Sequence, residues 1–214
     1  MRTFFYLAVI FLALSCNKNH DPAYDKNKKS EFTVEFDNVA GSADLELNAS
    51  YQNVSGEEVT VESLNYIIRN IVLTASDGST YSLPQGDVGF LIDESEEEST
   101  EISGEIPESE YKTLQFDVIF FEMDATSTAS NSGTFSYTLQ AATSGKTITL
   151  DLSARGTAKV ITGQHSEVHL LVDVLDFFSG FSFADNPTLT TSDFNTIPAS
   201  NLSRMFVHDH THND

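Results

Sequence analysis

The 214-residue sequence predicts an all-β protein, an antiparallel β-sandwich of the immunoglobulin-like or Greek-key type, with an open β-barrel as the alternative. Apolar residues recur at every second position in about ten short segments, which is the period of a half-buried strand. Glycine-marked turns separate these segments, and no long helical period is present.

The first expected strand begins at residue 31. Phe32, Val34 and Phe36 share one face of it, and Thr33 and Glu35 take the other. Further strands are expected in ADLELN, EEVTVESL, NYIIRNIVLTA, STYSL, VGFLID, YKTLQFDVIFF, TFSYTLQA, KTITLDL and EVHLLVDVLDFF. Turns are expected at Ala40-Gly41, Ser55-Gly56, Asp77-Gly78 and Ser144-Gly145.

The segment 179–203 is rich in Thr, Ser, Asn and Asp, and we expect it to run over the surface. Within it, IPASNLSRMF can form one short helix, because proline is tolerated in the first turn and Pro198 would lie there. A last strand must then begin near Met205.

The amino-terminal sequence MRTFFYLAVIFLALSC is typical of a secretory signal peptide, because its apolar run is too short to span a bilayer. Cys16, the only cysteine, stands where a bacterial lipoprotein is cleaved and acylated, although plain secretion and a chance cysteine are the alternatives. The expected organisation is therefore a signal peptide over residues 1–15, a flexible polar tether over 16–30, and one β-sandwich domain over 31–214.

The chain is strongly acidic, with a formal net charge of −21 that becomes −22 when Arg2 is removed with the signal peptide. Such a surface repels nucleic acid and favours cations as partners. The acidic run DESEEES at residues 93–99 lacks the glycine and the ligand spacing of a calcium loop, so we expect a solvated loop there.

The sequence contains no G-x-S-x-G, no phosphate-binding glycine loop and no H-E-x-x-H. We therefore expect a protein that is not an enzyme. A metal-dependent enzyme is a third interpretation, because histidine-bound metal can activate water, but no general base is identifiable from spacing.

The carboxyl-terminal sequence RMFVHDHTHND places His208, His210 and His212 at every second position. On a strand these imidazoles would share one face and could bind one ion, with a further ligand from a neighbouring strand such as His169. The alternatives are a solvated tail for the first three and an ordinary sheet histidine for His169. Imidazole suits copper, zinc and nickel, and affinity favours copper where it is available.

Several segments together resemble the MbnP-like copper-binding proteins, including lipoprotein members common in Bacteroidetes: VEFDNVAGSADLELN, YQNVSGEEVTVESLNYIIRNIVLTASDGS, FLIDES, VHLLVDVLDFF and DHTHN. The resemblance implies an extracytoplasmic β-sandwich that binds copper through histidines, and its terminal H-x-H-N motif corresponds to His210, His212 and Asn213. His208 is added on spacing alone. The family's tryptophan-derived copper ligand cannot be present, because the chain has no tryptophan, and a longer aromatic-rich insert of many relatives is also missing.

The first hypothesis is thus a lipid-anchored protein of the bacterial cell envelope that captures or buffers copper, with zinc possible, through these histidines. The alternative is an adhesion or ligand-binding lipoprotein without metal, whose recognition surface would use Phe177, Phe178, Phe181 and Phe183. A carboxyl-terminal strand that is ordered against the sheet, with its imidazoles facing another histidine, would favour the first.

Overall fold

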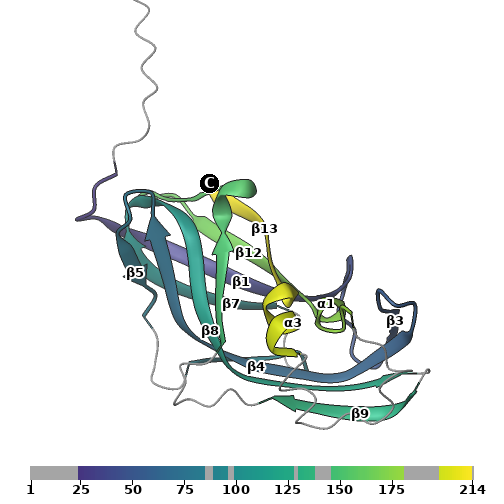
Figure 1. The fold of residues 1–214 in the computed structure, drawn as a ribbon. Coiled ribbons are helices and arrows are strands. Elements are labelled where there is room, and N and C mark those ends of the chain that lie inside the picture. The colour runs from purple at the N-terminus through teal and green to yellow at the C-terminus, as the bar shows by residue number, and fades with distance from the viewer. Residues whose placement is uncertain are drawn as a thin grey trace, which may run out of the picture.

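The computed structural model describes residues 24–84, 89–95, 99–127, 130–137, 146–180 and 198–213, which form two sheets (Figure 1). The smaller sheet has the order β13 (Phe206–Asn213), β12 (Ser166–Asp173), β1 (Lys29–Ala40) and β2 (Ala43–Asp44), and β7 (Ser99–Pro107) also pairs with β1. The larger sheet has the order β10 (Lys146–Asp151), β8 (Ser109–Ser127), β4 (Glu58–Ala75) and β3 (Ser50–Gln52). Its shorter strands are β9 (Ser130–Tyr137) and β11 (Ala158–Val160), paired with β8, and β5 (Thr80–Ser82) and β6 (Phe90–Asp93), paired with β4.

The predicted all-β sandwich is confirmed, and the sheets do not close into the alternative barrel. Figure 1 shows the long strands β4 and β8 curving beyond the smaller sheet. Two short helices, α1 (Val174–Phe177) and α3 (Pro198–Met205), lie side by side where β12 ends and β13 begins. A single 3₁₀ turn, Leu152–Ala154, follows β10. No helix in the described ranges is long and apolar enough to cross a membrane.

The core lies between the sheets, and aromatic rings join them. Phe206, the first residue of β13, lies 5.2 Å from Phe116 and 5.8 Å from Tyr66, measured between ring centroids. Phe116 in turn lies 5.4 Å from Phe36 of β1. Because a fully buried phenylalanine contributes about 1.5–3 kcal/mol, these contacts fix the start of β13 against the rest of the sandwich.

Three features differ from the sequence-based expectations. EEVTVESL and NYIIRNIVLTA form one strand, β4, instead of two. β7 begins at Ser99, inside the acidic segment expected to be a loop, because Ile102 and Ile106 alternate with exposed residues and are buried in the core. The sheets are mostly antiparallel, but β1 and β12 pair in parallel and bring Glu35 opposite His169.

The amino-terminal end of the domain is held by Glu108, between β7 and β8. Its carboxylate accepts hydrogen bonds from the backbone N–H groups of Asp25 and Thr162, each at 2.9 Å. The side chain of Thr162, together with these two N–H groups, lowers the pKa of Glu108 to about 2. β1 accordingly begins at Lys29, two residues before the expected start of the domain.

The helix expected in IPASNLSRMF is present as α3, which begins at Pro198, and β13 follows it directly, as predicted. The side-chain amide of Asn201 in α3 donates to the backbone carbonyls of Phe177 and Ser179, each at 2.9 Å. Phe177 and Phe178 are buried, so they belong to the core and not to a recognition surface. Phe181, Phe183, Cys16 and the signal peptide lie outside the described residues.

Candidate metal centre

The pairing of β12 with β13 determines which histidines meet. β12 buries three residues against the core, namely Val168, Leu170 and Val172. His169 therefore points to the opposite, outer face of the smaller sheet, as its position between two buried residues predicts. In the antiparallel register His169 lies opposite His210, and Glu167 lies opposite His212.

A β-bulge separates His208 from the other two terminal histidines. The register shifts between His169 and Leu170, so that Leu170 lies opposite His208 and Asp209 is the extra residue. His208 consequently faces the core with Leu170, while His210 faces outward with His169. The expectation that all three terminal histidines share one face therefore fails at Asp209, because a bulge interrupts the period of two.

The surroundings of His208 are those of a structural residue. Its side chain is buried, and its Nε2 atom lies 2.9 Å from the hydroxyl of Thr211. Burial lowers the pKa of His208, which favours the neutral imidazole. The structure therefore does not bring the ring of His208 into the group formed by the rings of the other predicted ligands.

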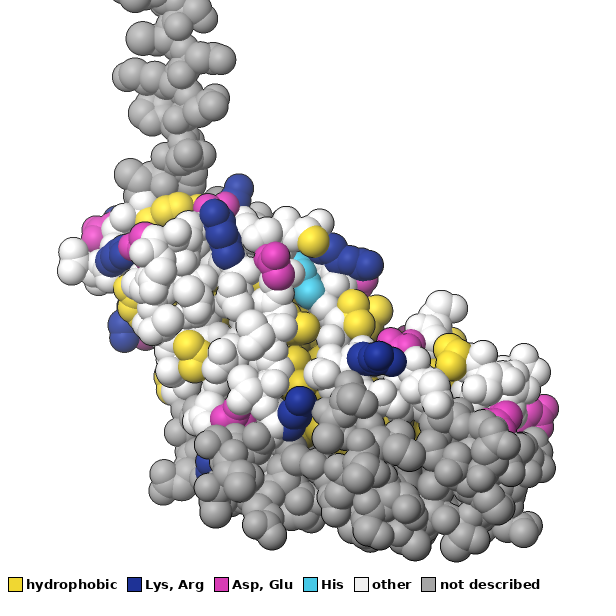
Figure 2. Space-filling model, viewed as in Figure 1, with side chains coloured by type: hydrophobic (Ala, Val, Ile, Leu, Met, Phe, Trp, Pro, Cys, Tyr) yellow, Lys and Arg dark blue, Asp and Glu magenta, His cyan; other side chains and the backbone are white. Residues whose placement is uncertain are grey.

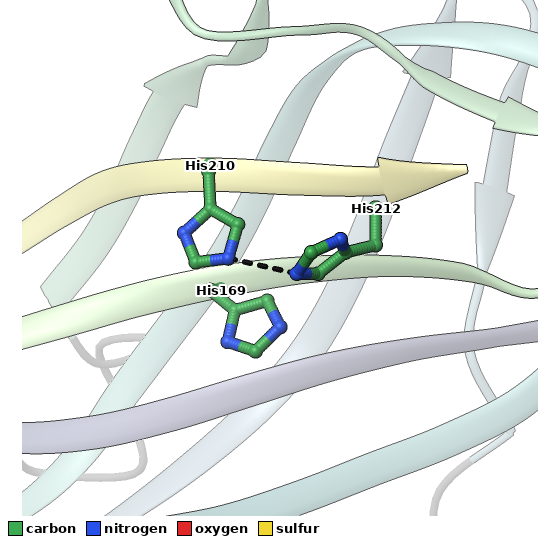
Figure 3. Close-up of side chains that lie close together, drawn as sticks. All are labelled: His169, His210 and His212. Carbon is green, nitrogen blue, oxygen red and sulfur yellow. Dashed lines mark hydrogen bonds between the residues drawn. The ribbon is translucent and has the colours of Figure 1, made fainter. Parts of the chain in front are cut away.

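His169, His210 and His212 form one cluster on the outer face (Figure 3). One nitrogen from each ring lies within 4.8 Å of those of the other two. The Nε2 atoms of His210 and His212 are 3.0 Å apart, and the rings of His169 and His210 stack with centroids 4.2 Å apart. Of the four histidines predicted as ligands, the structure thus assembles three, contributed by two neighbouring strands.

Two carboxylates determine which ring nitrogens are available. The Nδ1 atom of His210 lies 2.6 Å from a carboxylate oxygen of Asp209, and Asp209 is itself paired with Arg155 at 3.2 Å. The Nδ1 atom of His169 contacts the carboxylate of Glu35 in the same manner. Because a carboxylate can only accept, each Nδ1 carries the proton, and each neutral ring presents an Nε2 lone pair.

The Nε2 atom of His169 is buried and has no hydrogen-bond partner. A buried acceptor without a donor is unfavourable, and here it lies beside other electron-rich atoms. Two donor atoms bonded to one ion at about 2.0–2.1 Å lie about 2.8–3.6 Å apart for bond angles of about 90–120°. The separation between the Nε2 atoms of His210 and His212 falls in this range, so the cluster fits a transition-metal ion bound by imidazole nitrogens.

The surroundings of the cluster are acidic. Glu35, Glu167 and His169 form a second group whose ligand atoms lie within 4.8 Å of one another. Burial, and then the carboxylates of Asp44 and Glu35, raise the pKa of Asp37 above its ordinary value. Figure 2 shows acidic and basic side chains scattered over one face of the molecule. Carboxylates concentrated around the histidines raise the local concentration of cations.

Asn213, the last residue of the H-x-H-N motif, holds the end of β13 through its side-chain amide. Its side-chain oxygen accepts from the backbone N–H of Lys159 at 2.6 Å and from the hydroxyl of Ser166 at 3.3 Å. Its amide nitrogen donates to the carbonyl of Thr157 at 3.2 Å. Asn213 therefore fastens the end of β13 to β11 and β12, which holds His212 in place without contacting it.

The sequence-based prediction missed Glu35, Asp209 and Glu167 as partners of the histidines. Two signals were present in the sequence: Glu35 was placed on the outer face of the first strand, and Glu167 lies two residues before His169 on the same face. Neither signal shows that β1 lies beside β12, because that parallel pairing joins segments far apart in the chain.

Residues 29–118 match the model of the MbnP protein family. Among solved structures, MbnP from Methylosinus trichosporium is similar, with a TM-score of 0.45 and 12% sequence identity, over 72% of this chain and 79% of that one. No curated protein sequence matches the chain. The family match includes Glu35 and ends before the three clustered histidines. The resemblance found in the sequence is thus confirmed by an independent comparison: residues 29–118 are similar to the MbnP family.

Proposed function

We propose that this chain is a lipid-anchored, extracytoplasmic protein that captures or buffers copper through His169, His210 and His212. The observation that carries the proposal is the convergence of three imidazoles in which carboxylates fix two Nε2 atoms as lone pairs, one of them buried and without a donor. Imidazole nitrogens bind copper and zinc, and copper forms the more stable complexes.

The location belongs to the same proposal. The signal sequence and the position of Cys16 support export and acylation, and the resemblance to the MbnP family supports a role with copper outside the cytoplasm. The acidic surface would attract the ion while repelling anionic head groups. We propose a binding protein and not an enzyme, because the sequence carries no recognisable nucleophile or metalloprotease motif.

Metal titration of the purified protein tests the proposal. We expect His210→Ala and His212→Ala each to weaken copper binding by more than about 100-fold, because each removes a proposed ligand. Removing a residue that only hydrogen-bonds to a ligand typically weakens binding by about 10- to 100-fold. Val207→Ala is the control, since Val207 is exposed on the same strand and lies outside the three-histidine cluster. Equal copper affinity of wild type and both cluster variants would refute the site.

The same titration tests whether His208 is structural while His210 and His212 bind the ion. His208→Ala should leave copper affinity within about threefold of wild type, since His208 faces the core, while lowering the free energy of unfolding by about 1–3 kcal/mol. A loss of copper binding as large as that of His210→Ala, in a folded protein, would show that His208 is a ligand after all.

A further inference from the structure

Glu167 lies at the edge of the histidine cluster and has no role in the function proposed above. It is on β12, two residues before His169, and its side chain is 15% exposed. In the β12–β13 register it lies opposite His212. One of its carboxylate oxygens, Oε2, is 3.2 Å from Nε2 of His165 and 3.5 Å from Nε2 of His169.

The contact between Glu167 and His169 is not a hydrogen bond. Because Nδ1 of His169 donates to Glu35, its Nε2 atom presents a lone pair when the ring is neutral, and this atom has no hydrogen-bond partner. A carboxylate oxygen and an imidazole lone pair that face each other repel. The arrangement becomes favourable when a positive charge lies between them.

The separation fits two ligands of one ion. The 3.5 Å between Oε2 of Glu167 and Nε2 of His169 falls within the range of about 2.8–3.6 Å for donors bonded to the same metal, as does the 3.0 Å between the Nε2 atoms of His210 and His212. In the metal-free structure Glu167 is grouped with His169 and Glu35 and not with His210 and His212, so its side chain would turn toward the ion on binding. His165 holds the same oxygen from the other side, which orients the carboxylate toward His169.

We propose that Glu167 is a fourth, anionic oxygen ligand, and that it makes this site select a divalent ion, Cu(II) or Zn(II), over Cu(I). This inference rests on the function proposed above. Carboxylate oxygen is a harder donor than imidazole nitrogen, and it suits divalent borderline ions better than the soft, monovalent Cu(I). An added negative charge also stabilises a doubly charged ion more than a singly charged one.

The test compares the affinities of Glu167→Gln for Cu(II), Zn(II) and, under anaerobic conditions, Cu(I), each measured with a competing chelator. We expect Cu(II) and Zn(II) binding to weaken by about 10- to 100-fold, and Cu(I) binding to change by less than about threefold. The electron paramagnetic resonance spectrum of the Cu(II) form should also shift, because an oxygen ligand is lost.

Glu101→Gln is the matched control. Glu101 is an exposed carboxylate of β7 that lies opposite Glu35 in the β1–β7 register, so the variant removes the same charge from the same sheet. Equal losses in Glu101→Gln and Glu167→Gln would overturn the inference, because only the overall charge would matter. Unchanged Cu(II) and Zn(II) affinity in Glu167→Gln, with binding abolished in His210→Ala, would overturn the fourth ligand and leave the proposed function intact. Absence of metal binding in wild type would overturn both.

Discussion

The two faces of the smaller sheet differ in the polarity and burial of their side chains. The inner face of β1 and β12 is apolar, with Val34 and Leu170 fully buried, whereas the outer face carries Glu35 and His169 at the neighbouring positions. Strand alternation thus separates the residues that stabilise the fold from those that could bind an ion. At Asp209 the bulge breaks the alternation, so that His208 lies on the inner face of β13 although His210 lies on the outer face.

From this difference we expect stability and the proposed metal binding to be separable in this protein. A substitution on the inner face should change the free energy of unfolding of the metal-free protein and leave metal affinity nearly unchanged. A substitution on the outer face should do the reverse. Each of the following variants tests one side of that division.

Leu170→Ala should have the largest effect on stability. Leu170 is fully buried directly next to His169, and removing its side chain leaves a cavity that costs about 2–5 kcal/mol in the free energy of unfolding. Leu171→Ala is the matched control, because Leu171 is only half-buried on the outer face and should cost about 1 kcal/mol or less. Urea unfolding of the metal-free proteins measures both. A comparable loss in the two variants would contradict the division between the faces.

Glu35→Gln should act on the outer face alone. Glutamine replaces the acceptor-only carboxylate by a neutral amide, which can accept from Nδ1 of His169 or donate to it, so the proton is no longer held on Nδ1. We expect copper affinity to fall by about 10- to 100-fold with little change in stability. Nitrogen NMR of the metal-free protein reports the tautomer directly, so this effect can be observed without copper. The expected result is a mixture of the two tautomers at His169 in the variant and one dominant tautomer in wild type. An unchanged tautomer in Glu35→Gln would contradict the assigned role.

Much of this architecture follows from local sequence. The period of two in the segment beginning at Phe32 predicts which residues are buried, and the same argument places His169 outside between Val168 and Leu170. Pro198 predicts the start of the short helix before the last strand. These features depend on neighbours within a few residues, so one sequence is sufficient to find them.

The remaining features depend on pairing between distant segments. His208, His210 and His212 have the same spacing in the sequence whether the strand that carries them is uninterrupted or contains a bulge. Only the pairing with β12 shows that Asp209 is the extra residue. The partnership of Glu35 with His169 likewise requires the parallel pairing of β1 with β12. Spacing arguments therefore did not reveal the side chains that orient the histidines, although they did single out the three histidines that form the cluster.

Glu108 should give the smallest effect, which is present at neutral pH and disappears in acid. Its pKa is about 2 in the folded protein, below the ordinary value of 4.5, so its ionised form stabilises the fold above pH 4.5. This stabilisation is lost progressively as the pH falls from about 4.5 to 2, where the carboxylate becomes protonated in both states. Glu108→Gln should therefore be less stable than wild type at neutral pH, and the difference should shrink toward pH 2.

Chemical unfolding at a series of pH values measures this difference in stability, with Glu101→Gln as the exposed control. A constant difference at all pH values would show that Glu108 acts through its shape and not its charge. Metal affinity at neutral pH should remain unchanged, because Glu108 holds Asp25 and Thr162 and contacts none of the clustered histidines.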